Sequence, residues 1–326
     1  MRRRVTLLGG AAAWPLAARA QPTGKVARVG FLGNSLDNPI AGPAYKGFLA
    51  ELRKLGFTEG QNLVVEYRSA DEGMRKAFTA ANELAASKVE VLVAAGGTET
   101  GLQAAAAVRP ALPIVMLANN YDPFARGYVA SLARPGGNIT GVVYRQPELV
   151  VKQLELLAEA FPDRTRVGAL WDSLSADQFA VAERAAGSVR LSLRPFKLEN
   201  PPYDFDGAFT ALVQDEARML LVLSSPIFTP HMAHIGELAI RYGLPSMFIF
   251  KEYVEAGGLM SYGVDSVLPF RRAASYVAKI LRGAQPAELP VEQVDNFEFA
   301  LNLKTAKAIG VELPTSILLR ADEVIE

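Results

Sequence analysis

Two similar stretches of the chain constrain its fold more than any other feature. The first, from Val89 to Leu117, contains an apolar run, a Gly-Gly break, an Ala-rich stretch, a Leu-Pro pair and a second apolar run. The second, from Met219 to Phe250, repeats this order with Ser224-Ser225-Pro226 in place of the glycines. Short apolar runs without polar alternation indicate strands buried on both faces, as in parallel sheets covered by helices. We therefore predict an α/β protein with two Rossmann-like lobes, each built on a parallel sheet.

The length of the chain and the order of its elements indicate where the lobes begin and end. A chain of 326 residues exceeds one ordinary hydrophobic core and fits two domains. We expect crossings between the lobes near residues 140, 263 and 290, which together form a multi-crossing hinge. The expected domains are lobe 1 at 21–141 plus 264–290 and lobe 2 at 142–263 plus 291–326. We also expect a short helix at 128–132 and a polar turn at 251–253.

Candidate ligand-binding residues follow from the positions of the strand ends. Ligands of open α/β sheets bind outside the carboxyl ends of the strands, and two lobes can present these ends to one shared cleft. Gly97 and Thr98 precede a helix and can offer amide and hydroxyl donors to a carboxylate, whereas Asn120 and Asp122 can accept from an ammonium group. Trp171 can stack on an apolar ligand, although a buried tryptophan is more often part of the core. The candidates are Asn34, Ser35, Gly97, Thr98, Asn120 and Asp122 in lobe 1, and Trp171, Asp172, Ser224, Ser225, Glu252 and Tyr253 in lobe 2. Helix capping and ordinary turns are the alternative roles for these polar residues.

Several classes of function lack their sequence signature. The chain has no cysteine, no G-x-S-x-G motif and no phosphate-binding loop. His231 and His234 have a spacing that can bind a metal, but no acidic residue flanks them in an H-E-x-x-H pattern, so a solvated helix start is the simpler interpretation. Lys+Arg and Asp+Glu balance at 34 each, which favours no nucleic-acid partner. We therefore expect a protein that is not an enzyme, with no metal and no cofactor.

The N-terminus has the pattern of an export signal. Arg2-Arg3-Arg4 forms a basic segment, Val5 to Leu16 is a short apolar stretch, and Ala18-Arg19-Ala20 matches the A-x-A cleavage pattern. The apolar stretch is too short to span a bilayer, which takes about 20 residues. We expect residues 1–20 to be a signal peptide, cleaved after Ala20, that directs the protein to the periplasm by the Sec or the twin-arginine route.

Longer blocks of the sequence resemble a known protein family. The blocks are GFTEGQNLVVEYR (56–68), VASLARPGGNITGV (129–142), LPSMFIFKEYVEAGGLMSYG (244–263) and NLKTAKAIGVELPTSILLRADEVIE (302–326). They are similar to blocks that occur in the same order in the periplasmic substrate-binding proteins of the TrpX-like ABC-transporter group. The N-terminal segment TLLGGAAAWPLAARAQ is similar as well, so the resemblance covers essentially the whole chain.

The resemblance implies a fold, a function and partners. The fold is that of type I periplasmic binding proteins, in which hinge closure encloses a ligand between two lobes. The function is to deliver a small organic solute, as a monomer, to a membrane permease and its ATPase. Some family members are similar to binders of aromatic amino acids, so the expected ligand is an amino acid, aromatic or not, or a related carboxylate. This chain departs from the family at presumed cleft positions such as Glu99 and Phe248-Ile249-Phe250, so the resemblance does not identify the ligand. A ligand-sensing module of the same fold and an exported Rossmann-like enzyme are the alternatives.

Overall fold

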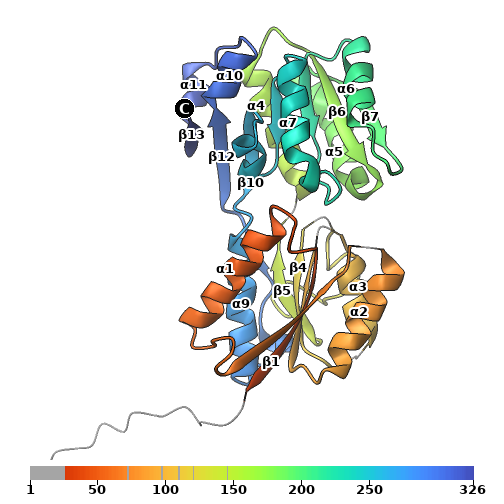
Figure 1. The fold of residues 1–326 in the computed structure, drawn as a ribbon, viewed down its shortest axis with the longest axis vertical. Coiled ribbons are helices and arrows are strands. Elements are labelled where there is room, and N and C mark those ends of the chain that lie inside the picture. Colours follow the sequence, from red (N-terminus) through yellow and green to blue (C-terminus); the bar gives the residue numbers. More distant parts are fainter. Residues whose placement is uncertain (1–25, 72, 97, 109–110, 120, 145) are drawn as a thin grey trace, which may run out of the picture.

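The protein consists of two α/β lobes, which lie one above the other in Figure 1. The computed structural model describes residues 26–71, 73–96, 98–108, 111–119, 121–144 and 146–326. The segment expected to be a signal peptide, residues 1–20, lies outside this range, as do the candidates Gly97 and Asn120. The two lobes with parallel-dominated sheets confirm the predicted fold class.

Lobe 1 is built on a six-stranded sheet in which all strand pairs are parallel. Its strands are β1 (Ala27–Gly33), β2 (Leu63–Ser69), β3 (Val91–Ala95), β4 (Ile114–Ala118), β5 (Ile139–Val143) and β11 (Glu292–Gln293), in the order β11-β5-β4-β3-β1-β2. Its helices are α1 (Ala41–Lys54), α2 (Met74–Ala86), α3 (Thr100–Val108) and α9 (Leu268–Leu281). Helices α1 and α9 pack together on one face of the sheet, and α2 and α3 pack together on the other (Figure 1).

Lobe 2 is built on a seven-stranded sheet that contains one antiparallel pair, β10 with β12. Its strands are β6 (Arg166–Asp172), β7 (Ser192–Leu198), β8 (Met219–Val222), β9 (Ser246–Phe248), β10 (Met260–Val264), β12 (Phe297–Asn302) and β13 (Glu323–Ile325), in the order β13-β12-β10-β9-β8-β6-β7. Its helices are α4 (Gln146–Ala160), α5 (Ala176–Ala186), α6 (Phe205–Gln214), α7 (Met232–Arg241), α8 (Lys251–Glu255), α10 (Leu303–Ala308) and α11 (Thr315–Leu318).

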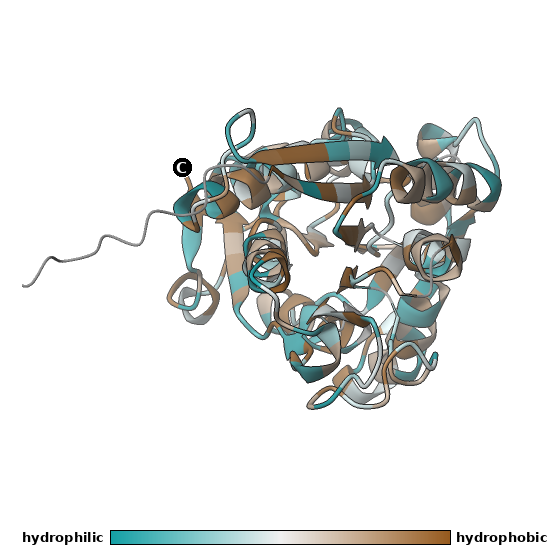
Figure 2. Cartoon of the chain, turned by 90° about the horizontal axis from the view of Figure 1, so that it is seen from below, coloured by the Kyte–Doolittle hydropathy of each residue, from teal (hydrophilic) through white to brown (hydrophobic). Residues whose placement is uncertain are grey.

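The pattern of apolar residues explains why these segments are strands and helices. Strands β3 and β4 are buried along their whole length, as the continuous apolar runs of the first repeated unit predict. Helix α9 buries only part of its surface and exposes Arg271 and Arg272. In Figure 2 the helices accordingly have brown and teal sides, whereas strands in the interior are largely brown. No helix within the described residues is long and apolar enough to cross a membrane.

The chain passes between the lobes after β5, after β10 and after β11. Strand β5 extends to Val143 and β11 occupies Glu292–Gln293, so the first sheet reaches two or three residues beyond the expected lobe boundaries at 141 and 290. One buried apolar cluster contains Val142 of lobe 1, Tyr144 of the first crossing and Phe250 of lobe 2. The hydrophobic core is therefore continuous through the hinge.

Two local predictions are wrong. Residues 128–132 form bends and irregular backbone rather than a helix, because Gly127 has a positive φ of 78° and the Ala130 amide donates to Pro135 O instead of to the preceding turn. Residues 251–253 are not a polar turn but the start of the short helix α8, which ends where Gly257 adopts a φ of 111° and the Gly258 amide donates to Tyr253 O.

Candidate functional site

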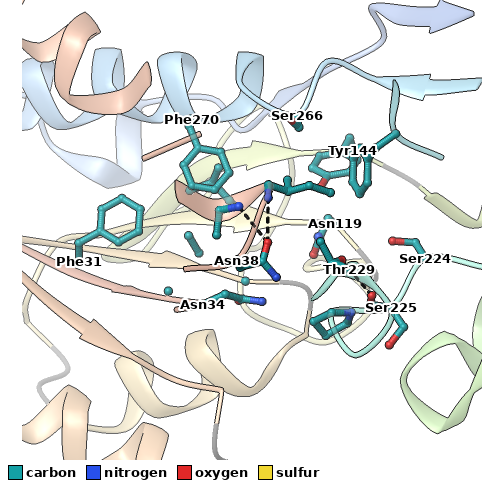
Figure 3. A pocket seen from close by; sticks show the side chains of 18 of the residues that line it. Phe31, Asn34, Asn38, Asn119, Tyr144, Ser224, Ser225, Thr229, Ser266 and Phe270 are labelled. Atoms are coloured by element: carbon teal, nitrogen blue, oxygen red, sulfur yellow. Dashed lines mark hydrogen bonds between the residues drawn. The ribbon is translucent and has the colours of Figure 1, made fainter. Parts of the chain in front are cut away.

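A pocket lies between the lobes at the carboxyl ends of their strands (Figure 3). It contains about 710 Å³ of space that no atom fills, including its solvent-exposed mouth. Lobe 1, lobe 2 and two of the crossing segments all contribute to its lining. The position agrees with the general rule for α/β sheets, in which the strand ends and the turns after them form the binding surface.

Aromatic side chains form much of the pocket lining. They are Phe31, Tyr67, Tyr144, Phe250 and Phe270. The Phe31 ring stacks on Tyr67 with a centroid distance of 5.3 Å and an interplanar angle of 14°, and on Phe270 with a distance of 6.2 Å. Because Phe31 is only 1% exposed and is packed on several sides, this wall is fixed before a ligand enters. Such a surface suits a flat apolar or aromatic group.

The polar residues that lobe 1 contributes lie at the starts of helices and in the turns after strands. The Asn38 side-chain oxygen accepts from the Ile40 and Ala41 amides at 3.0 and 3.1 Å, which leaves the side-chain nitrogen as a donor. Tyr67 donates its hydroxyl proton to the Asn34 carbonyl and so fixes the turn after β1. Asn119, at the end of β4, has a buried side-chain oxygen without a partner among the described residues.

The polar wall of lobe 2 is the turn after β8, and buried side chains hold it from behind. Gln178 clamps Ser224 by accepting from its amide at 3.0 Å and donating to its carbonyl at 2.9 Å. Ser225 donates its hydroxyl proton to Asp172 Oδ2. The other oxygen of Asp172 accepts from the Leu174 and Ser175 amides, each at 3.0 Å. Both Ser224 and Ser225 line the pocket, whereas Asp172 is 2% exposed and lies behind them.

A second carboxylate lies behind the crossing segment. Ser266, between β10 and α9, lines the pocket and donates its hydroxyl proton to Glu252 Oε1 at 2.5 Å. Glu252 Oε2 is buried and has no partner among the described residues. Burial raises the pKa of Glu252, because it disfavours the charged form, while the hydrogen bond from Ser266 acts in the opposite direction. The neighbouring Tyr253 stacks on Phe248 at 4.8 Å and belongs to the core.

The other sequence candidates have varied positions. Ser35 and Thr98 line the wider part of the cleft that adjoins the pocket through Asn34. Asp122 caps a turn by accepting from the Phe124 and Ala125 amides at 2.9 and 3.1 Å, and it lines a separate groove of lobe 1. Trp171 stacks on Phe179 at 4.2 Å, and Lys197 lies over its ring at 5.3 Å. The structure therefore brings Asn34, Ser224 and Ser225 together in the pocket but does not bring Asp122 or Trp171 there.

Several pocket residues were not among the sequence candidates. Asn119 and Ser266 are polar residues that follow predicted strands, so the rule that selected the candidates could have included them. The aromatic side chains gave no such signal, since an aromatic residue within a strand or helix is normally assigned to the core. Only the convergence of β1, β2 and α9 shows that Phe31, Tyr67 and Phe270 face one cavity.

The histidine pair lies elsewhere. His234 Nε2 is 2.9 Å from Asp206 Oδ2, and the ring of His231 packs against Phe205 at 4.9 Å. Neither histidine lines the pocket. The part of the chain that the structure describes contains no group of three or more His, Cys, Asp or Glu residues placed to hold a metal ion.

Comparisons with known proteins agree with this arrangement. Residues 34–325 match the family described as ABC transporter substrate binding protein. A tyrosine-binding protein from Clostridioides difficile (strain R20291) is 23% identical over 287 residues, which cover 85% of this chain and 79% of that protein.

Solved structures share the fold. A conserved domain protein from Vibrio cholerae superposes with a TM-score of 0.82 at 24% identity, covering 92% of this chain and all of the other. An ABC domain from Streptococcus pneumonia in complex with L-Trp superposes with a TM-score of 0.81, at the same identity and coverage. The fold is that of the periplasmic binding proteins, as the sequence resemblance implies. Because the family match extends over nearly the whole described chain, the protein belongs to the family of ABC transporter substrate-binding proteins.

Proposed function

We propose that the protein captures an aromatic amino acid between its two lobes and delivers it to an ABC permease and its ATPase. The observation that carries this proposal is the interlobe pocket, in which aromatic rings line a cavity that also holds amide and hydroxyl groups. Two relatives, described as a tyrosine-binding protein and as a complex with L-Trp, support the choice of ligand class.

The proposed mechanism is closure by differential binding. A ligand that contacts Phe31 and Phe270 on lobe 1 and the Ser224-Ser225 turn on lobe 2 stabilises the arrangement in which both surfaces reach it. The crossings allow the lobes to open and close about one hinge. We further propose that the protein is exported to the periplasm after removal of residues 1–20, by the Sec or the twin-arginine route, and acts there as a monomer.

The pocket favours binding over catalysis. Ser225 donates to the buried Asp172, but no histidine lines the pocket within the described residues, so the serine has no neighbouring general base of the usual kind. Family membership in turn favours transport over a purely sensory role.

The direct test is the thermal unfolding of residues 21–326 with L-tryptophan, L-tyrosine, L-phenylalanine, aliphatic amino acids, aromatic acids and nucleobases, followed by calorimetry of each ligand that binds. A ligand at 100 times its Kd stabilises the folded state by about 2.7 kcal/mol, which raises Tm by several degrees. We expect this rise for aromatic amino acids. A rise for another class alone, with none for the aromatic amino acids, would contradict the proposal.

A matched pair of phenylalanine variants connects the binding to the pocket. Phe270→Ala removes one aromatic wall and is expected to weaken binding by about tenfold or more. Phe124→Ala is the control, because Phe124 also belongs to lobe 1 but is 56% exposed and lines the separate groove. Equal affinities in both variants would move the ligand away from the aromatic wall.

A further inference from the structure

The hydrogen bonds behind the pocket determine which of its polar atoms can donate and which can only accept. An ionised carboxylate has no proton to give, so in the contact with Asp172 the Ser225 hydroxyl is the donor. The same oxygen accepts from the Ile227 amide at 3.1 Å. Its remaining lone pair is then what Ser225 presents to the pocket. Ser225 is therefore an acceptor for the ligand and not a donor.

Ser266, on the other side of the pocket, is also left as a hydrogen-bond acceptor. Its hydroxyl proton is directed to Glu252 Oε1 at 2.5 Å, so the oxygen of this pocket-lining residue is left to accept. The buried oxygen of Asn119, which has no partner among the described residues, is a third acceptor. In Figure 3 Asn119 lies between Ser266 and Ser225. The three acceptors thus belong to one pocket, and they come from lobe 1, lobe 2 and a crossing segment.

The charges lie one layer behind these acceptors. The pocket lining itself, as far as the structure describes it, contains no Asp, Glu, Lys or Arg. Asp172 and Glu252 are buried or largely buried, and neither forms an ion pair with a described basic residue. Each of these two carboxylates polarises the serine hydroxyl that donates to it, and neither negative charge has a paired cation among the described residues. This end of the cavity is therefore favourable for a positive group with several N–H donors.

We propose that Asp172 and Glu252 are positioning residues that build, through Ser225 and Ser266, the subsite for the α-ammonium group of the ligand, with Asn119 as the third acceptor. This inference rests on the proposed function, since it assigns one end of the amino acid. The three N–H donors of an ammonium group match the three acceptors. The ligand carboxylate then lies toward lobe 1, where the Asn38 side-chain nitrogen is left to donate.

A purely structural role for the two carboxylates predicts a different outcome. Asp172 caps the turn at Ser173–Ser175, so its loss can loosen the pocket as a whole. Such loosening weakens every ligand alike. Loss of an ammonium subsite weakens amines only, and leaves the matching acid without the amino group nearly unaffected. The ratio of the two affinities therefore separates the two roles.

The experiment measures Kd by calorimetry for three matched pairs: L-tryptophan with 3-(indol-3-yl)propanoic acid, L-phenylalanine with 3-phenylpropanoic acid, and L-leucine with 4-methylpentanoic acid. The variants of residues 21–326 are Asp172→Asn and Glu252→Gln. Asp163→Asn and Glu312→Gln are the controls, because Asp163 is exposed just before β6 and Glu312 is exposed between α10 and α11. We expect the wild type to prefer the amine by about tenfold to a hundredfold. Each variant, but neither control, should reduce that preference by about tenfold while changing the Kd of the acid by less than about threefold.

Each other result has a definite meaning. Equal losses for amine and acid would overturn this inference and leave the proposed function intact. If only the leucine pair binds, with the amine preference dependent on Asp172 and Glu252, the aromatic ligand class fails and the ammonium subsite stands. If no pair shows an amine preference in the wild type, the subsite is overturned. Should Asp172→Asn fail to fold, Glu252→Gln together with Ser266→Ala decides the result.

Discussion

At the scale of single residues, the burial of the Glu252 carboxylate disfavours its charged form. One of its oxygens is buried without a partner among the described residues, and burial raises its pKa. A folded-state pKa above the unfolded value means that the folded protein holds this proton more tightly than the unfolded chain does. The stability that this gives is fully present below the unfolded pKa and is lost as the pH rises through the folded pKa. At neutral pH the ionised group therefore destabilises the ligand-free protein.

Glu252→Gln is accordingly expected to raise the Tm of the ligand-free protein at about pH 7.5, by about 2 °C, since glutamine cannot ionise. The difference should shrink as the pH falls and the wild-type carboxyl becomes protonated. Lys251 and Glu255 on α8 and Glu298 on β12 are the charged neighbours, and all three are unchanged in the variant. Calorimetric unfolding across the acid range measures the effect, with the exposed Glu312→Gln as the control.

A lower Tm for Glu252→Gln at neutral pH would show that this carboxylate stabilises the hinge instead. The expected combination, higher stability with weaker amine binding, is typical of a residue kept for function at the expense of stability. It also separates Glu252 from Asp172, whose hydrogen bonds hold the turns after β6 and β8, so that Asp172→Asn is expected to lower Tm.

At the scale of elements, the approach of β4 and β5 depends on one glycine. Gly141 in β5 has a φ of 139°, and a Cβ there would lie 2.2 Å from the carbonyl oxygen of Met116 in β4. That oxygen belongs to a fully buried strand of the sheet and cannot move freely. Strand β5 leads directly into the first crossing and to Tyr144 of the pocket, so its position also fixes part of the site.

Gly141→Ala should therefore destabilise the protein strongly, by about 3 kcal/mol or more, through backbone strain and a steric clash. Gly187→Ala is the matched control, because Gly187 has a φ of −62° and a Cβ there meets no atom within 4 Å. Urea unfolding gives the midpoint and slope for each variant. Similar midpoints for Gly141→Ala and the wild type would mean that β4 and β5 can separate without loss of stability.

At the scale of the whole molecule, the interlobe pocket lies beside the crossings, so the proposed ligand would bind next to the hinge. The lobes have separate sheets, and the segments after β5, β10 and β11 connect them. Ser266 and Tyr144, which belong to these segments, line the pocket itself. In the proposed closure, ligand contacts with the crossings would act directly on the segments that bend.

A saturating aromatic amino acid is expected to reduce the radius of gyration of the protein in solution, because the closed arrangement is more compact. Small-angle X-ray scattering with and without L-tryptophan measures this change, and glycine, which lacks an aromatic group, is the control ligand. A radius of gyration that stays constant while calorimetry shows a saturated site would contradict closure by the ligand.

The sequence alone determined the pattern of apolar and polar residues along the chain and, with that pattern, the fold class. Continuous apolar runs such as Val91–Ala95 are buried wherever the chain places them, and Gly and Pro residues end the elements by their local backbone limits. These are short-range properties, so the order of strands and helices and the two lobes could be predicted. The blocks that resemble a known family led to the same fold class, and the family match covers residues 34–325.

Only the tertiary structure decided which residues face the pocket. Asp122 follows a strand as the rule requires, yet its carboxylate caps its own turn, and Trp171 stacks on Phe179. Phe31 and Phe270, far apart in the sequence, meet in one aromatic wall. Asp172 and Glu252 support the pocket from behind two serines instead of lining it. The physical reason is that side-chain direction and long-range packing arise when distant segments meet, and no local pattern of residues contains that information.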